Sequence, residues 1–156
     1  MTRRGKGPWP VNNTESAVKV WFVKRIESAL EADERVPVAD LALEYISQQS
    51  KGMRIAMSYL YSESEIDRLA VIAEDVASGL PIQYAIGQTF FAGLSLQTLP
   101  GVLIPRPETE ELLVAFTDKL GDGFKGSVLD IGTGSGCIAL GVKDRVGSST
   151  VFAVDI

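Results

Sequence analysis

Apolar side chains recur every three or four positions through the first half of the chain, which is the spacing of helices that bury one face. The pattern predicts four helices, over residues 16–30, from Pro37 to Lys51-Gly52, over residues 53–61, and after Ser62 as far as Gly79. Ser62 and Glu65 have the spacing of a capping box, and Pro37 suits the first position of a helix. We therefore expect a small helical bundle, with an aromatic stripe in its core made by Trp21, Phe22 and Tyr45.

The pattern changes after Pro81, where short runs alternate with a period of two. Residues 89–91 and 94–98 flank Ala92-Gly93, which predicts a β-hairpin. Residues 100–107 follow, and the prolines on either side of Arg106 hold the backbone extended, so that a helix can begin only at Pro107. The helix dipole favours the acidic residues in the first turn of this helix. Its buried stripe is predicted to be Leu112, Leu113, Phe116 and Leu120.

A strand, a glycine-rich turn, a helix and a second strand are predicted over residues 127–155. Residues 127–131 have the composition of a buried strand, residues 137–145 have helical spacing, and residues 150–155 form a second apolar run. Two strands joined by a helix imply a right-handed crossover and a parallel sheet. Cys137 is expected to pack beneath the turn as a small apolar residue.

Composition excludes several kinds of active site. The 156 residues contain no histidine, which excludes a Ser-His-Asp triad, a Cys-His pair and the usual zinc sites, and we expect no metal. Fifteen Lys and Arg against twenty Asp and Glu give a net charge of −5, which argues against direct binding of nucleic acid. The single cysteine cannot form an internal disulfide, and no apolar run approaches the ~20 residues that span a bilayer. These features predict a cytoplasmic protein without a membrane segment.

The turn Gly132-Thr133-Gly134-Ser135-Gly136 is the candidate binding site. Its glycines leave the backbone bare, so that a ligand can approach where a Cβ would collide, and the helix that follows favours an anionic group. Asp155, at the end of the next strand, is placed to accept hydrogen bonds from ribose hydroxyls. Position 137 is cysteine, which argues against the G-x-G-x-x-G of nicotinamide cofactors, and no Gly-Lys-Ser/Thr follows, which excludes a P-loop. The alternative is a tight turn without ligand, in which Asp130 is a charge partner of the helix and Asp155 a solvated strand end.

Two separated motifs carry a resemblance to known families. The pattern D-x-G-x-G-x-G, from Asp130 to Gly136, resembles the start of the S-adenosylmethionine-dependent methyltransferases. With Pro105-Arg106-Pro107-Glu108-Thr109-Glu110 before it, the stretch from about Pro81 to Ile156 is similar to the amino-terminal part of one family. That family is the protein-(glutamine-N(5)) methyltransferases of the HemK type, which modify peptide-chain release factors.

The resemblance implies a fold of class α + α/β, with a flexible tail over residues 1–14 and a helical substrate-recognition domain over 15–80. A β-hairpin linker over 81–106 and the start of a truncated, Rossmann-like methyltransferase domain over 107–156 follow. By the resemblance, the S-adenosylmethionine site consists of Asp130, Gly132, Thr133, Gly134, Ser135, Gly136 and Asp155. Residues near the methionine end of that cofactor would be Pro105, Arg106, Pro107, Glu108 and Thr109. For this second set the alternative is a linker and helix cap, with Arg106 paired to Glu110. The implied partner is a peptide-chain release factor.

The chain departs from the family at one motif. The family's Asn-Pro-Pro-Tyr, which would hold the substrate amide in line with the methyl group, occurs nowhere in the 156 residues. We therefore assign no catalytic residue and expect a fragment that is inactive alone, with a two-stranded sheet that leaves apolar surface bare. Two other functions stay open, a non-catalytic module whose helical bundle binds a protein partner, and a methyltransferase with a different acceptor such as a ribosomal protein.

Overall fold

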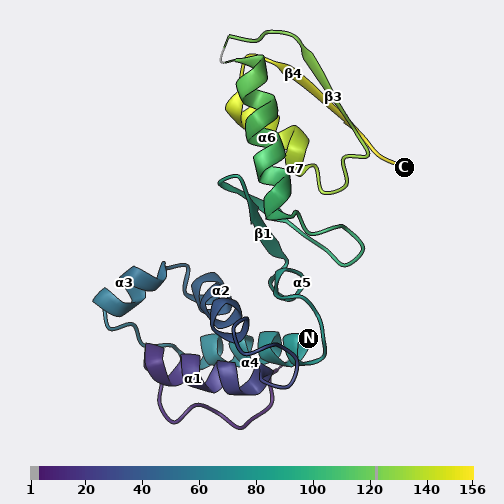
Figure 1. The fold of residues 1–156 in the computed structure, drawn as a ribbon. Helices are drawn as coiled ribbons and strands as arrows, with labels where there is room; N and C mark the ends of the chain where they lie inside the picture. Colours follow the sequence, from purple (N-terminus) through teal and green to yellow (C-terminus); the bar gives the residue numbers. More distant parts are fainter. Residues whose placement is uncertain (1–3, 122) are drawn as a thin grey trace. The chain divides into compact units, whose positions relative to one another are not determined.

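The computed structural model describes residues 4–121 and 123–156, and the chain divides into two compact units between Ile86 and Gly87. The helices of the first unit are visible in Figure 1. They are α1 (Glu15–Ile26), α2 (Arg35–Ser47), α3 (Lys51–Ala56), α4 (Glu63–Ala77) and α5 (Ile82–Ile86). The predicted helical character of this part of the chain is confirmed.

The core of the first unit lies where α1, α2 and α4 pack against one another, with α5 against α2 and α4. Trp21 and Phe22 are buried there as predicted, and their rings meet edge to face with centroids 6.4 Å apart. Tyr45 is half-buried and packs against the same core. The aromatic stripe therefore contributes to folding, as the spacing of these residues indicated.

The predicted boundaries of α2 and α3 were wrong. α2 begins at Arg35 and not at Pro37. Pro37 is tolerated inside the first turn because the N–H groups there have no acceptor within the helix, so the N–H that proline lacks is not missed. The helix ends at Ser47, since Gln48 adopts the left-handed conformation with φ of 54°. Lys51-Gly52 begins α3 and does not end α2, because Ser50 caps it by accepting a hydrogen bond from the N–H of Met53 at 3.4 Å.

The capping box at the start of α4 is confirmed. The hydroxyl of Ser62 accepts from the N–H of Glu65 at 3.3 Å, and the Glu65 carboxylate accepts from the N–H of Ser62 at 2.8 Å. Burial alone would raise the pKa of Glu65, but hydrogen bonds from Tyr59 and Ser62 hold that pKa below its usual value. Glu65 is therefore ionised where the helix dipole favours negative charge.

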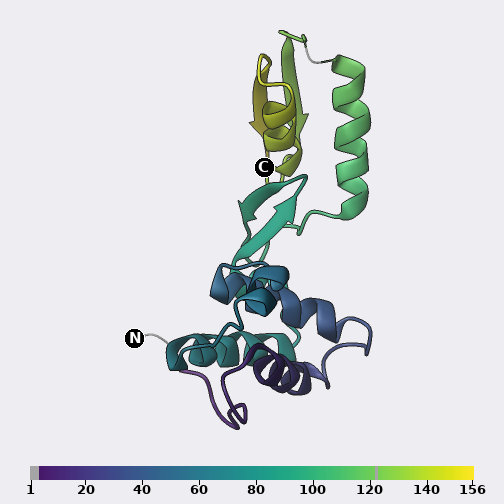
Figure 2. The same ribbon diagram turned by 90° about the vertical axis from the view of Figure 1, so that its left-hand side faces the viewer.

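The second unit contains a hairpin and a strand–helix–strand element (Figure 2). Its elements are β1 (Gln88–Phe91), β2 (Leu94–Gln97), α6 (Pro107–Leu120), β3 (Ser127–Ile131), α7 (Cys137–Arg145) and β4 (Thr150–Val154). The β1–β2 pair is antiparallel. Ala92 and Gly93 between the strands both have positive φ, as a two-residue type I′ turn requires. β3 and β4 are parallel, as predicted, with Ser127 opposite Thr150.

The hairpin shares its buried residues with the helices of the second unit. Phe91 and Leu96 lie in one apolar cluster with Leu113 of α6 and with Cys137 and Val142 of α7. Cys137 packs there as expected. The predicted boundaries at residues 80 and 106, and the mobility of residues 1–14, stay predictions.

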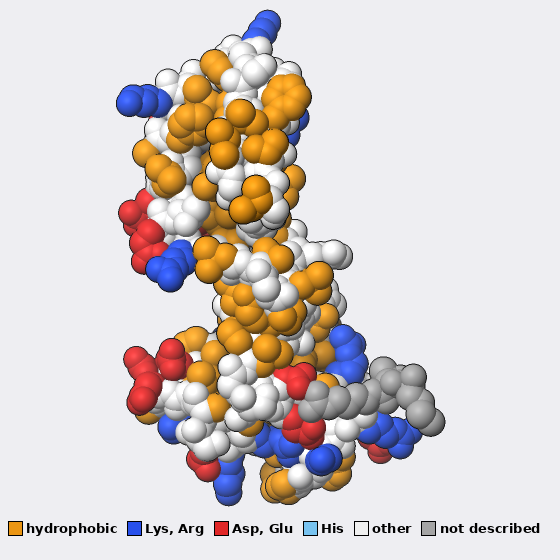
Figure 3. All heavy atoms as spheres, turned by 90° about the vertical axis from the view of Figure 1, so that its right-hand side faces the viewer, with side chains coloured by type: hydrophobic (Ala, Val, Ile, Leu, Met, Phe, Trp, Pro, Cys, Tyr) orange, Lys and Arg blue, Asp and Glu red, His pale blue; other side chains and the backbone are white. Residues whose placement is uncertain are grey.

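The prediction that residues 127–131 form a buried strand was wrong for one face of the sheet, whereas the expectation that a two-stranded sheet leaves apolar surface bare is confirmed. α7 packs against the strand pair and α6 packs against α7. Side chains on the face of the strand pair away from α7 are exposed. The upper part of Figure 3 shows apolar side chains gathered on this face. The exposed apolar residues are Leu129 (56%), Ile131 (76%), Phe152 (55%) and Val154 (47%). This bare surface is what a parallel pair covered on one side must have.

The buried stripe of α6 is narrower than predicted. Leu113 is fully buried, whereas Leu112 is 60% and Phe116 38% exposed. Thr117 is buried in their place, and its hydroxyl donates to the carbonyl of Leu113 at 2.9 Å. Most of the contacts of α6 are with α7, and Leu113 also reaches the cluster of Phe91 and Leu96, so one narrow face is covered. Among the helices of the described residues, none has the length and apolar character that crossing a bilayer requires.

Candidate functional site

The glycine turn between β3 and α7 adopts a backbone that only glycine takes readily. Gly132, Gly134 and Gly136 have φ of 74°, 54° and 75°. A Cβ added at Gly132 or Gly134 would meet no atom within 4 Å, so the glycines are not needed to avoid a collision within the protein. Their bare backbone instead faces open space in which a ligand can lie against it.

Two sets of hydrogen bonds fix the shape of this turn. The carbonyl of Val154, at the end of β4, accepts from the N–H groups of Gly132 and Thr133 at 2.9 and 3.1 Å. The carboxylate of Asp130 accepts from the hydroxyl of Thr133 at 2.7 Å. Asp130 thus closes the turn from the strand side, so that the backbone is arranged before any ligand arrives.

Asp155 lies directly beside the turn. Its Oδ2 accepts from the N–H of Gly134 and its Oδ1 from the N–H of Ile156, the latter at 2.8 Å. The N–H groups of Ile156 and Gly134 hold the pKa of the Asp155 carboxyl below its usual value. Asp155 is 21 residues from Gly134 in sequence, and the structure brings its exposed, ionised carboxylate next to the glycine turn.

The first turn of α7 points its N–H groups toward the same place. Gly136 is the N-cap residue, and because it has no side chain no side-chain acceptor caps the helix. Uncapped N–H groups at a helix N-terminus favour an anionic or polar acceptor. Hydrogen bonds join Asp130 and Asp155 to the turn, and α7 begins directly after Gly136.

The second predicted set of residues occupies the start of α6. Arg106 is the N-cap residue with an extended backbone, and Pro107 is the first residue of the helix, as expected. Within the described residues, no hydrogen bond or ion pair joins residues 105–109 to the glycine turn, and none joins Arg106 to Glu110. The role of Pro105, Arg106, Pro107, Glu108 and Thr109 near a cofactor stays a prediction.

One contributor to the site was missed. The carbonyl of Val154 holds two N–H groups of the turn, but a backbone carbonyl has no signature in the sequence. The register of β3 against β4, with Ile131 opposite Val154, is what places it there.

Comparisons with known proteins identify relatives of this chain. No family model matches the chain. The release factor glutamine methyltransferase of Bacillus subtilis is 37% identical over 131 residues, which are 81% of this chain and 46% of that protein. The one of Chlorobaculum tepidum is 31% identical over 151 residues, 88% of this chain and 51% of that protein. The one of Streptococcus pneumoniae is 45% identical over 96 residues, 61% of this chain and 34% of that protein.

The chain spans about half the length, or less, of the curated relatives it matches. The aligned residues nevertheless cover most of this chain in the Bacillus and Chlorobaculum relatives. The chain therefore belongs to the family of the release factor glutamine methyltransferases.

Proposed function

We propose that these residues form the donor-binding part of a methyltransferase whose donor is S-adenosylmethionine. The whole protein would transfer a methyl group to the side-chain amide nitrogen of a glutamine in a peptide-chain release factor. The observation that carries the proposal is the left-handed glycine turn at residues 132–136, open to solvent and flanked by the Asp155 carboxylate. S-adenosylmethionine supplies a sulfonium-activated methyl group when bound.

The residues at the turn fit such a donor. Gly132 and Gly134 leave room for a ligand against the backbone. An ionised carboxylate has about four acceptor positions, and Asp155 uses two of them on N–H groups. The remaining positions suit the two hydroxyls of a ribose. We assign Asp155 to the ribose, Asp130 and Thr133 to the shape of the turn, and residues 132–136 to the surface on which the donor lies.

The acceptor is proposed from the relatives, whose names give a glutamine of release factors. We further propose that the strand–helix–strand element belongs to a Rossmann-like domain, since its parallel strands and glycine turn have that arrangement. The single cysteine, which cannot form an internal disulfide, supports a cytoplasmic setting.

Isothermal titration calorimetry of the chain with S-adenosylhomocysteine tests the donor site. We expect one site per chain for this ligand, and no heat of binding from NAD at the same concentrations, because position 137 is not glycine. A folded chain that binds neither the donor nor its product would contradict the proposal.

A second assay tests the part played by the missing motif. The chain and a release factor are incubated with S-adenosylmethionine carrying a labelled methyl group. Because Asn-Pro-Pro-Tyr is absent from the 156 residues, we expect donor binding without transfer of label. Transfer by this chain alone would show that other residues orient the glutamine.

A further inference from the structure

A cavity beside α3 in the helical unit is lined by charged and hydroxyl-bearing side chains. It measures about 490 Å³, which is within the usual range of small-molecule sites in proteins. Its walls come from the start of α1, from α3 and from the segment that follows α3. The polar lining residues that matter here are Glu15, Lys19, Lys51, Arg54 and Ser58.

Arg54 is a fully buried cation in this wall, and one of its nitrogens has no acceptor. Nε donates to Glu15 at 3.0 Å and Nη1 to the carbonyl of Gln49 at 2.7 Å, whereas Glu44 is 51% exposed and approaches Nη1 only to 4.0 Å. Nη2 has no hydrogen-bond partner among the described residues. An unpaired buried donor costs most when it belongs to a charged group. Since Arg54 lines the cavity, a ligand in that cavity can supply the missing acceptor.

The close ion pairs around the cavity leave one positive charge in excess. Lys19 and Lys51 share the carboxylate of Asp40, at 2.6 and 3.0 Å, and Arg54 contacts that of Glu15. Three cations are thus in close contact with two carboxylates, which favours a ligand with a single negative charge. The chain as a whole carries a net charge of −5, so its overall charge does not attract an anion to this place. A carboxylate also matches the planar geometry of a guanidinium.

Ser58 places a hydroxyl at the cavity in a conformation that glycine adopts more easily. It follows the C-cap residue of α3 and has φ of 50°, in the left-handed region. Glycine is the usual residue at this position after a helix. Side chains held in sparsely populated backbone conformations cluster at binding sites. The sequence thus has a hydrogen-bond donor where glycine would suit the backbone better.

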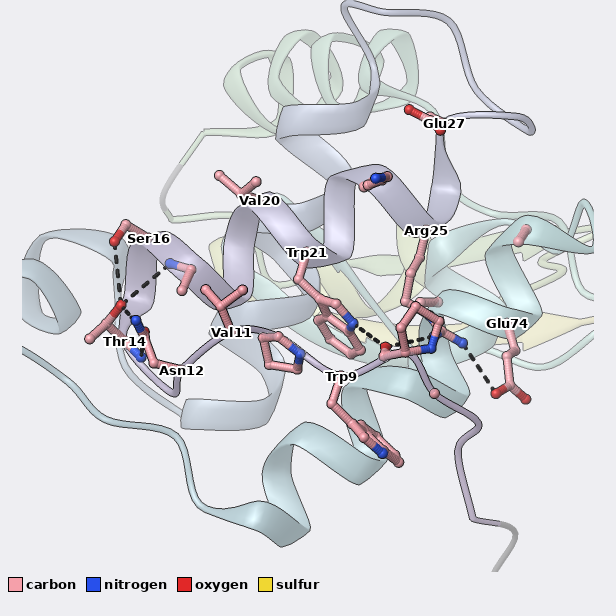
Figure 4. A pocket seen from close by; sticks show the side chains of 17 residues that line it. Trp9, Val11, Asn12, Thr14, Ser16, Val20, Trp21, Arg25, Glu27 and Glu74 are labelled. Atoms are coloured by element: carbon pink, nitrogen blue, oxygen red, sulfur yellow. Dashed lines mark hydrogen bonds and ion pairs between the residues drawn. The ribbon is translucent and has the colours of Figure 1, made fainter.

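A larger cavity along α1, of about 860 Å³, differs because the chain's own backbone pairs its donors. The indole N–H of Trp21 and the guanidinium of Arg25 both donate to the carbonyl of Pro8, at 2.6 and 3.3 Å. Figure 4 shows these two side chains converging on that oxygen and Arg25 reaching Glu74. The N–H groups of residues 5–6 likewise donate to carboxylates of α4. A ligand there would compete with residues of the same chain, whereas the cavity beside α3 offers an unpaired donor.

We propose that the cavity beside α3 binds a small monocarboxylic acid with a short apolar chain. The carboxylate would accept hydrogen bonds from Nη2 of Arg54, from the hydroxyl of Ser58 and from the ammonium group of Lys51. The apolar chain would lie against Ile55 and Leu60, which line the same cavity and are 60% and 59% exposed. The inference does not depend on the proposed donor site, because all of these residues belong to the helical unit.

A nuclear magnetic resonance titration of the full chain with hexanoate tests this proposal. The Nε–H of Arg54 and the amides of Ile55 and Ser58 should shift and saturate, with a dissociation constant on the order of 1 mM for a ligand of so few atoms. Hexan-1-ol has the same apolar chain without the carboxylate, and it should bind at least about tenfold more weakly. Hexyl phosphate, with a charge of about −1.5 to −2, should also bind more weakly than hexanoate.

Three variants separate binding from folding and from overall charge. Ser58→Gly relieves the left-handed serine, so its thermal unfolding midpoint should be equal or higher, while hexanoate should bind about three- to tenfold more weakly. Lys51→Gln should weaken hexanoate binding about two- to fivefold, because its ammonium group is half-exposed. Lys24→Gln is the matched control, since Lys24 is exposed on α1 and does not line this cavity. It should bind hexanoate like the unaltered chain.

The proposal is overturned if hexanoate shifts none of these resonances, or if hexan-1-ol or hexyl phosphate binds as tightly as hexanoate. It is also overturned if Ser58→Gly binds hexanoate as well as the unaltered chain does, or if Lys24→Gln and Lys51→Gln weaken binding alike. The last result would mean that hexanoate responds to the overall charge of the chain and not to this cavity.

Discussion

Replacing Gly134 by alanine should separate the cost of the left-handed turn from its role in holding a ligand. Gly134 has φ of 54°, and the added Cβ meets no atom within 4 Å. The variant should therefore lose only the conformational advantage of glycine, about 1 kcal/mol of folding free energy. Gly79→Ala is the matched control, because Gly79 has φ of 94°, also faces open space, and lies in the helical unit.

The two variants should differ in donor affinity. At Gly134 the methyl group occupies part of the open space in which a ligand would lie against the backbone of the turn. Loss of one hydrogen bond to a polar or charged ligand group costs about 1.5–3 kcal/mol, which is about a ten- to hundredfold weaker affinity. Calorimetry with S-adenosylhomocysteine should show this weakening for Gly134→Ala and no change for Gly79→Ala. An affinity of Gly134→Ala within about twofold of the unaltered chain would refute the reasoning.

Two further predictions concern the helical unit. Glu15→Ala should lower the free energy of unfolding by about 3 kcal/mol in urea titrations, because Arg54 is fully buried and its Nε donates to Glu15 at 3.0 Å; a loss below about 1 kcal/mol would contradict this. Burial alone would raise the pKa of Asp40, but Lys19 and Lys51 outweigh it and hold the pKa below the usual 3.8. The stability that Asp40 adds over Asp40→Asn should therefore be present at pH 7 and shrink as pH falls below about 4, and an equal difference at pH 7 and pH 3 would contradict it.

The parts of the fold that local sequence determines were predictable. Ala92-Gly93 between two alternating runs gave the hairpin, and Pro107 after an extended segment gave the start of α6. The capping box at Ser62 and Glu65 located α4. In each case the residues that define the structure are neighbours in the chain.

Other features depend on contacts that a single sequence does not display. Lys51-Gly52 suggested the end of a helix, but the cap at Ser50 makes it the beginning of one. The apolar composition of residues 127–131 suggested a buried strand, yet Leu129 is 56% exposed, because burial depends on how many elements cover the sheet.

The candidate site shows the same division. The glycine spacing predicted the turn, and Asp155 was expected beside it from the order of strand, helix and strand. The bonds from Gly132 and Thr133 to the carbonyl of Val154 follow from strand register, which the sequence does not specify. The contacts of Gly5, Lys6 and Pro8 with α1 and α4 were missed because these residues contribute backbone atoms, which have no signature in the sequence.

The most direct test of the central claim is a titration of the labelled chain with S-adenosylhomocysteine, followed through its amide resonances. We predict that the largest shifts fall on Gly132, Thr133, Gly134 and the first residues of α7, with Asp155 and Ile156 beside them. Saturable binding with shifts confined to the helical unit, or no shift at the glycine turn, would contradict the claim that this backbone holds the methyl donor.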